Sequence, residues 1–164
     1  MKGHRSVLLN CLLPLALSLL LYTLFRTRDT IVNQAFIHLL GFRPPVLRLP
    51  QAPWVVYNLP GALWLYAFLW FTSLSRSKFL TLLPLGLALG IETVQLLHLT
   101  DGTFDGLDVF FYLLSLLAFV GLGGMGWVRP DPQAALPRQR LSLGFKCVFA
   151  LFIAIVALSD VWVK

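Results

Sequence analysis

Long apolar runs separated by short polar segments dominate the pattern along the chain. A helix needs about 20 apolar residues to cross a bilayer. The pattern therefore predicts an all-α fold, a polytopic transmembrane helix bundle with about five spans: residues 6–25, 54–75, 79–100, 107–128 and 141–163. The first run imitates a signal peptide, but it is too long and no small-residue cleavage site follows, so we expect a retained anchor. Aromatic residues that suit membrane interfaces fall near the span ends, at Trp54, Tyr57, Trp70, Trp127 and Trp162.

The one long connection, residues 26–53, is expected to contain a short helix that ends at Leu40. Asp29 or Thr30 is suited to cap its start, and Gly41 with Pro44 and Pro45 to stop it. About eleven residues cannot cross a membrane, so this helix is expected to lie in the interface. Its predicted apolar face consists of Ile31, Val32, Ala35, Phe36 and Leu39. Residues 129–140, with three prolines and three arginines, are typical of a polar surface loop.

Composition supports a membrane protein with a single domain, residues 1–164. Hydrophobic residues make up 58% of the chain and charged residues 12%, with a mean hydropathy of +0.80, whereas soluble domains are about 45–50% apolar and about 25% charged. The net charge of +6 is scattered between the apolar runs, so we expect no nucleic-acid partner. Cys11 and Cys147 both lie in apolar runs and indicate buried small residues rather than a disulfide or a zinc site.

The distribution of charge also predicts an orientation. With five spans, seven Lys or Arg residues fall on the side of the N-terminus and five on the other side. The loop from Asp101 to Gly106 is acidic and has no basic residue. Since basic loops stay in the cytoplasm, this loop is expected outside and the N-terminus inside, in a bacterial cytoplasmic membrane.

The third span contains the most informative polar residue, Glu92. It lies about 8 residues before the predicted end at Thr100, which corresponds to a depth of about 12 Å at 1.5 Å per residue. Ionisable groups inside a membrane are costly and are functional candidates by default. Gln95 and His98 continue a polar arc on the same helix. Gly86 and Gly90 form a GxxxG pattern on another side, which predicts close helix packing there.

The fourth span begins with Asp105 and Asp108, and Tyr112 and Ser115 follow Asp108 on one helical face. A loop of about six residues joins this span to the third, so the two are expected to be antiparallel neighbours. The sequence therefore predicts an acidic pocket between spans three and four. The predicted polar cluster comprises Glu92, Gln95, Asp105, Asp108, Tyr112 and Ser115.

Structural roles for the same residues stay open at this point. Asp105 suits an N-cap, Asp108 suits the first turn of a helix dipole, and Glu92 is able to form a structural hydrogen bond with Gln95. His98 suits a solvated surface position, and Tyr112 and Ser115 suit ordinary packing. Earlier in the chain, Asn58–Gly61 interrupts the second span, where Pro60 predicts a kink or the end of a short interfacial turn.

Three of these segments resemble the VanZ-like family of bacterial membrane proteins. They are Glu92-Thr-Val-Gln95, Gly102-Thr-Phe-Asp105 with Asp108, and the preceding stretch from Asn58 to Trp64. The resemblance covers about residues 54–124 and implies a bacterial envelope protein with an important Glu/Asp cluster. The founding member is linked to low-level teicoplanin resistance. The chain has Thr103, Tyr112 and Ser115 where the family often has Arg, Asn and Gly, so we do not extend glycopeptide resistance to it.

The expected function is the binding of a membrane lipid or a lipid-linked cell-wall precursor by its headgroup in the acidic pocket. Arg43 and Arg48 are candidate headgroup contacts, because phosphate next to carboxylates needs a cation. No cofactor and no bound metal are expected. Two alternatives stay open: a Mg²⁺-dependent enzyme acting on a lipid-linked phosphate, and a subunit of a proton-coupled transporter. No nucleophile–base pair or phosphate-binding loop is recognisable, which favours a non-enzyme. A purely structural subunit, a homo-oligomer or a membrane-protein partner are further possibilities.

Overall fold

The computed structural model describes residues 8–25, 31–41, 45, 47–73, 77–99, 103–123, 144, 147 and 151. Within these ranges every regular element is a helix, so the prediction of an all-α fold is confirmed. The elements are the π-helix η1 (Leu8–Leu12) and the α-helices α2 (Leu13–Phe25), α3 (Ile31–Leu40), α4 (Pro53–Tyr57), α5 (Leu59–Ser73), α6 (Lys78–Leu96) and α7 (Gly106–Gly121). Most of the predicted fifth span, the loop 129–140 and Arg43 lie outside the described residues.

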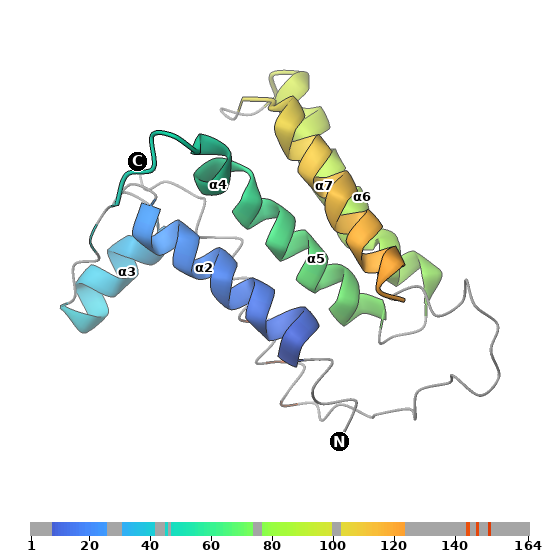
Figure 1. The fold of residues 1–164 in the computed structure, drawn as a ribbon, viewed down its shortest axis with the longest axis horizontal. Coiled ribbons are helices and arrows are strands. Elements are labelled where there is room, and N and C mark those ends of the chain that lie inside the picture. Colours follow the sequence, from blue (N-terminus) through green and yellow to red (C-terminus); the bar gives the residue numbers. More distant parts are fainter. Residues whose placement is uncertain are drawn as a thin grey trace.

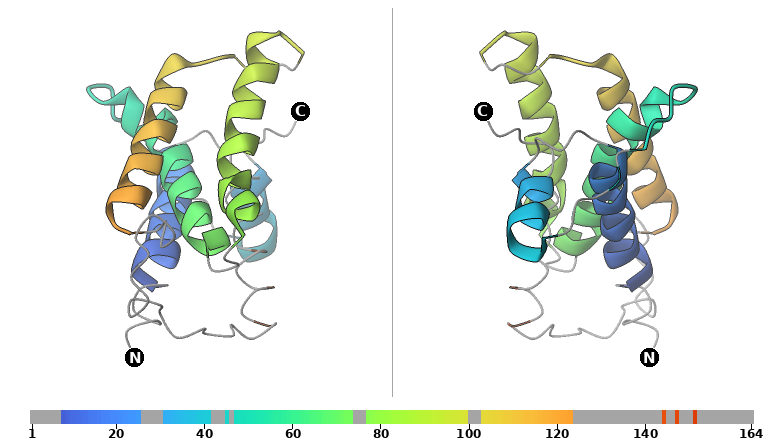
Figure 2. Two further views of the ribbon diagram at one scale, coloured as in Figure 1. Left: turned by 90° about the vertical axis from the view of Figure 1, so that its right-hand side faces the viewer. Right: turned by 90° about the vertical axis from the view of Figure 1, so that its left-hand side faces the viewer.

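Helix α5 is the centre of the arrangement. It packs against α2 on one side and against α6 and α7 on the other (Figure 1). Figure 2 shows α6 and α7 running in opposite directions, joined at one end, which confirms that they are antiparallel neighbours. Two clusters of buried side chains fill the contacts of α5. One consists of Cys11, Leu15, Tyr22 and Ala67, and the other of Leu65, Leu69, Ala88 and Phe119.

Two buried serine hydroxyls fasten the first turn of α5 to its neighbours. Ser18 of α2 donates to the carbonyl oxygen of Pro60 at 2.9 Å, and Ser115 of α7 donates to the carbonyl oxygen of Ala62 at 2.8 Å. Each such bond contributes about 1 kcal/mol when both partners are buried. The start of α5 is therefore held from both sides, in the region where the polar residues of the chain gather.

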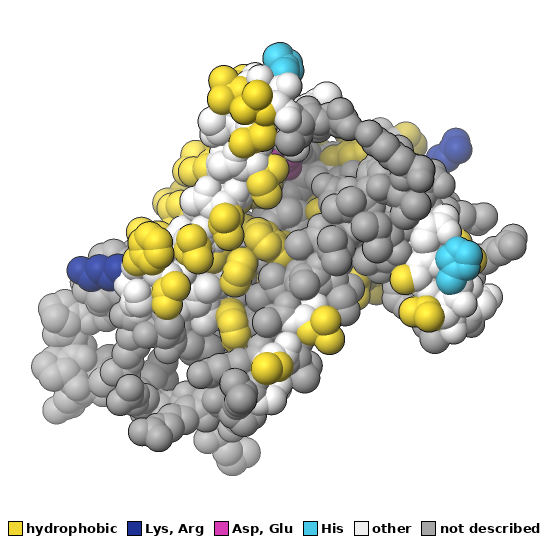
Figure 3. Space-filling model, turned by 180° about the vertical axis from the view of Figure 1, so that it is seen from behind, with side chains coloured by type: hydrophobic (Ala, Val, Ile, Leu, Met, Phe, Trp, Pro, Cys, Tyr) yellow, Lys and Arg dark blue, Asp and Glu magenta, His cyan; other side chains and the backbone are white. Residues whose placement is uncertain are grey.

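Helix α6 buries a narrow stripe of residues and exposes most of its large apolar side chains. Among the described helices, α6 is the one long and apolar enough to cross a membrane, whereas the apolar helices Leu9–Phe25 and Gly106–Gly121 are shorter. Its buried residues are Thr81, Pro84, Ala88 and Glu92. Its exposed large side chains include Phe79, Leu83, Leu87, Ile91 and Leu96. Figure 3, seen from behind, shows hydrophobic side chains gathered along this helix.

The ends of α6 differ from the predicted span. Ser77 caps the start, because its side chain accepts a hydrogen bond from the backbone N–H of Leu80 at 3.4 Å. The helix ends at Leu96 rather than near Thr100. His98 adopts a left-handed conformation with φ of 54°, which is the usual way in which a helix terminates. The predicted extension to Thr100 was therefore wrong by about a turn.

Two other predictions about helix faces have mixed outcomes. The short helix before Gly41 is confirmed as α3, and Gly41 ends it with a φ of +62°. Among its described side chains, however, Asn33 is buried and Leu39 of the predicted apolar face is 81% exposed. The side chains of Ile31, Val32 and Phe36 lie outside the described ones, so the prediction for them stays a prediction. The close packing predicted for the GxxxG pattern was wrong within the described residues. Both glycines of α6 are exposed, and a Cβ added at either would meet no atom within 4 Å.

Candidate functional site

The junction between α4 and α5 places the first residue of the site, Asn58. Its backbone N–H donates to the carbonyl oxygen of Trp54 at 3.0 Å and ends α4, while its carbonyl oxygen accepts from the N–H of Ala62 at 3.2 Å. Pro60 has no N–H, so the hydrogen-bond ladder cannot continue regularly through this point. The predicted interruption of the second span is therefore confirmed. The break leaves the Asn58 side chain only 2% exposed.

Asn58 joins two carboxyl groups that come from the start of α7. Its Nδ2 donates to Oδ2 of Asp105 and to Oδ1 of Asp108, both at 3.0 Å. A side-chain amide has two N–H hydrogens, so both are used. The two acceptor oxygens are at most 6.0 Å apart, since each lies 3.0 Å from the same nitrogen. One amide thus holds together two carboxylates that would otherwise repel each other.

Asp105 has a structural role as well as its contact with Asn58. Its second oxygen, Oδ1, accepts from the backbone N–H of Leu107 at 2.9 Å and so caps α7. Its backbone carbonyl accepts from the N–H of Asp108 at 3.1 Å, and Asp108 lies in the first turn of the helix. Both helix-start roles are confirmed. Negative groups stabilise a helix N-terminus, so both aspartates are favourably placed at the start of α7.

Glu92 completes the group from α6. It is 4% exposed, and its Oε2 is buried without a hydrogen-bond partner. Its carboxyl group interacts with the side chain of Tyr112, with the backbone of Asp105, and with the charges of Asp105 and Asp108. Glu92 lies four residues before the helix ends at Leu96, which corresponds to about 6 Å along the axis. It is therefore closer to the helix end than the 12 Å inferred from the sequence.

Tyr112 and Ser115 lie on the α7 face that carries Asp108, as the helical spacing predicted. The Tyr112 ring lies against α5 at Gly61, where an added Cβ would be 3.5 Å from both Cε1 and the hydroxyl oxygen. At this distance an added Cβ would be in ordinary van der Waals contact with the ring, whereas a longer side chain would meet it. Ser115 bonds to α5 through Ala62, as described above. This bond is a packing contact between α7 and α5, and the membership of Ser115 in the functional cluster stays a prediction.

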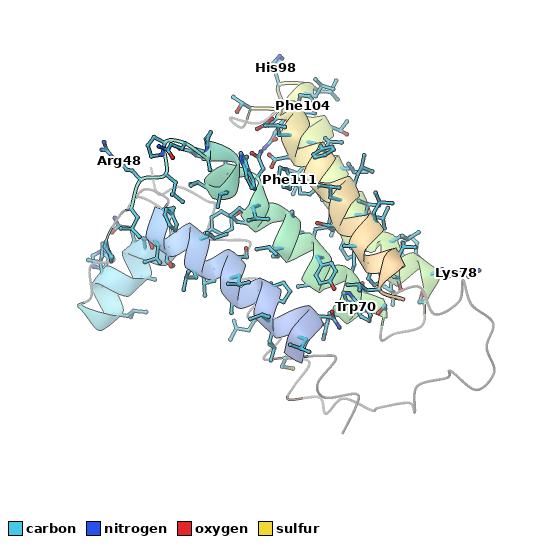
Figure 4. The ribbon with its side chains drawn as sticks, viewed as in Figure 1. Arg48, Trp70, Lys78, His98, Phe104 and Phe111 are labelled. Atoms are coloured by element: carbon cyan, nitrogen blue, oxygen red, sulfur yellow. The ribbon has the colours of Figure 1, made fainter. Side chains whose placement is uncertain are left out.

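The remaining predicted residues are less closely associated with this group. Gln95 is half-buried one turn beyond Glu92, and the interactions of Glu92 do not include it. His98 is exposed at the end of α6, and Arg48 points away from α6 and α7 (Figure 4). Among the described residues, no group of three or more His, Cys, Asp or Glu side chains is arranged to hold a metal ion. Cys11 is buried as predicted, whereas Cys147 is exposed.

We call Asn58, Glu92, Asp105, Asp108 and Tyr112 the acid cluster. In the sequence, Asn58 was treated as part of a kink and of the stretch that resembles the VanZ-like family, but not as a site residue. Its position could have indicated a site residue, because it is an amide beside a helix break in an otherwise apolar segment. Comparison with known proteins adds no relative: no protein-family model, curated protein or solved structure matches this chain. The chemistry of the acid cluster is therefore the basis for a functional assignment.

Proposed function

We propose that the chain is a multi-pass membrane protein of the bacterial envelope, VanZ-like in character, that binds a lipid or cell-wall-precursor headgroup at the acid cluster. In this proposal five spans cross the cytoplasmic membrane, with the N-terminus in the cytoplasm. The acid cluster then lies at the outer end of the bundle. The protein acts as a binding protein rather than an enzyme.

The surface of the described helices supports the membrane part of the proposal. Large apolar side chains point outward along α6 and α7, among them Leu87 at 50%, Ile91 at 57% and Leu117 at 66% exposure. Soluble monomers rarely expose contiguous apolar surface on this scale. The polar residues Thr81, Glu92 and Ser115 are buried instead. This arrangement suits a lipid environment, in which polar groups gain most by facing other helices.

The observation that carries the binding part is the buried oxygen of Glu92. Oε2 has no hydrogen-bond partner and lies on a carboxyl group that interacts with two further acids. Buried carboxyl groups without partners are rare, because loss of hydration is not compensated. A ligand that donates a hydrogen bond at this point supplies the missing partner. The cluster also lies in the last turn of α6, within reach of a headgroup at the membrane boundary.

The proposal is tested by mass spectrometry of the lipids that remain bound after gentle purification. The wild-type protein is compared with Glu92→Gln and Asp108→Asn, which keep side-chain size but remove charge. Thr93→Ala is the matched control, because Thr93 is the exposed neighbour of Glu92 on the same helix. We expect a specific lipid or precursor, enriched over the bulk membrane, in the wild type and the control only. Lipids that mirror the membrane in all four proteins would overturn the binding function.

The orientation is tested separately with a chain in which Cys11 and Cys147 are replaced by serine. Single cysteines are then introduced at Thr103, beside the acid cluster, and at Ser77, at the opposite end of α6. A thiol reagent that does not cross membranes should label Thr103→Cys in intact cells, and Ser77→Cys only after lysis. The reverse pattern would place the acid cluster in the cytoplasm.

A further inference from the structure

The hydrogen-bond donors around the acid cluster are fewer than its acceptors require. Both N–H hydrogens of Asn58 bond to the two aspartates, and the N–H of Leu107 bonds to Asp105. The backbone of Asp105 and the Tyr112 side chain, which has a single hydroxyl hydrogen, also interact with Glu92. Oε2 of Glu92 remains without a donor although it is buried. What the site lacks is therefore an additional donor rather than an additional acceptor.

The cluster also lacks positive charge within the part of the chain that the structure describes. The described Lys and Arg side chains are Arg48 and Lys78. Figure 4 places Lys78 at the far end of α6 and Arg48 on the loop before α4, pointing away from the cluster. Glu92 meanwhile interacts with the charges of both aspartates. Like charges so close together in a buried setting are costly unless a cation or a proton reduces them.

An aromatic pair borders the same place. Trp54 lies one turn before Asn58 on α4, and Phe111 lies one turn after Asp108 on α7. Their rings stack with centroids 5.8 Å apart and planes 16° apart. Trp54 is nevertheless 46% exposed. An aromatic pair at this place favours an organic cation over an anion, and the N–H donors that the carboxylates require then distinguish a primary from a quaternary ammonium.

From these three observations we infer that the group bound by the acid cluster is a primary ammonium, with one N–H donating to Oε2 of Glu92. A primary ammonium has three donors and a compact positive charge, which supplies both missing elements at once. Charge-assisted bonds of this kind are about twice as strong as neutral ones. A phosphate would be repelled by the carboxylates, and a hydroxyl would supply a donor without charge. The inference rests on the proposed headgroup binding and specifies its chemistry.

The test uses the full chain reconstituted in nanodiscs that contain equal parts of phosphatidylglycerol, phosphatidylethanolamine and phosphatidylcholine. The last two lipids have the same phosphate and the same formal charge, but only ethanolamine has N–H donors. Bound lipids are measured by native mass spectrometry. We expect phosphatidylethanolamine to be enriched about tenfold over phosphatidylcholine, as expected for one charge-assisted bond of about 1.4 kcal/mol. The enrichment should fall to none in Glu92→Gln and persist in Thr93→Ala.

A second measurement identifies the source of the ammonium group. Water-soluble ethanolamine is added to the protein in phosphatidylglycerol nanodiscs, and thermal unfolding is recorded with choline as the control. Stabilisation by ethanolamine but not by choline indicates that the amine suffices, as it would on a precursor peptide. Enrichment of phosphatidylethanolamine in the first measurement, without stabilisation by free ethanolamine in the second, indicates that the membrane anchor is needed too.

The outcomes separate this inference from the proposed function. Specific retention of a lipid without a primary amine, lost in Glu92→Gln, would overturn the ammonium inference and leave headgroup binding intact. Equal retention of all three lipids together with no effect of ethanolamine would overturn both. Circular dichroism in the aromatic region, where Trp54 and Phe111 contribute, verifies that Glu92→Gln is folded.

Discussion

Asn58 is the residue whose replacement tests the geometry of the acid cluster most directly. Asn58→Leu keeps a side chain of similar size in a position that is 2% exposed, but it removes both N–H donors. Hydrogen bonds to charged groups contribute about 1.5–3 kcal/mol each. Since two such bonds are lost and both are only partly buried, the low end applies. We expect the free energy of unfolding to fall by about 3 kcal/mol.

The assay is equilibrium unfolding of the purified protein in mixed micelles of dodecylmaltoside and increasing amounts of sodium dodecyl sulfate. Asn10→Leu is the matched control, because Asn10 accepts a neutral hydrogen bond from the Tyr66 hydroxyl at 2.8 Å and lies on η1, away from the acid cluster. Its expected cost is about 1 kcal/mol. The difference between the two variants isolates the contribution of the two carboxylates.

A double-mutant cycle then assigns that difference to a particular pair. Combining Asn58→Leu with Asp108→Asn should show a coupling of about 1.5 kcal/mol, the value of one charge-assisted bond. Combining Asn10→Leu with Asp108→Asn should show additive effects. The reasoning is refuted if Asn58→Leu lowers the free energy of unfolding no more than Asn10→Leu does. It is also refuted if Asp108→Asn lowers that free energy equally in the Asn58→Leu and Asn10→Leu backgrounds.

Three further predictions concern residues around the cluster. His98→Gly should raise the free energy of unfolding by about 1 kcal/mol in the same titration, because glycine adopts positive φ without strain; a loss of stability would contradict a purely terminating role. Ser115→Ala should lower the free energy of unfolding by about 1 kcal/mol, because its bond to Ala62 is lost. An unchanged free energy of unfolding would show that this bond does not stabilise the contact between α7 and α5. Gly61→Ala should leave lipid retention unchanged, since its Cβ would make ordinary contact with Tyr112 at 3.5 Å, but Gly61→Leu should displace the ring and abolish retention.

Periodicity along the helices was sufficient to predict which acids meet. Asp108, Tyr112 and Ser115 share a face because positions separated by four and seven residues fall on the same side of a helix. The short connection to α6 then brings Glu92 to the same end. These predictions depend on local geometry and on one tight turn, which are properties that a single sequence contains.

The contribution of Asn58 could not be obtained in the same way. Its partners Asp105 and Asp108 are 47 and 50 residues further along the chain, and only the packing of α5 against α7 brings them together. The end of α6 was missed for a different reason. Leu97 and Leu99 continue the apolar pattern, while a backbone turn at His98 ends the helix. Hydropathy measures side-chain preference and is insensitive to such a turn.

The exposed glycines of α6 illustrate a third limit. A GxxxG pattern indicates that a helix is able to approach another closely, but not that it does so. In the described structure Ala88, between the two glycines in sequence, is buried, whereas Gly86 and Gly90 are exposed. The buried side of α6 carries Thr81, Pro84, Ala88 and Glu92 instead.

The lengths of the capped helices have a consequence for the surrounding bilayer. Helix α6 has 19 residues and α7 has 16, so their axes extend about 28 Å and about 24 Å. A typical hydrocarbon core is about 30 Å thick. In the membrane that we propose, hydrophobic mismatch would therefore draw the leaflets together around this pair of helices. Local thinning would lower lipid headgroups toward Glu92, so that the bilayer itself brings the ligand to the carboxylate.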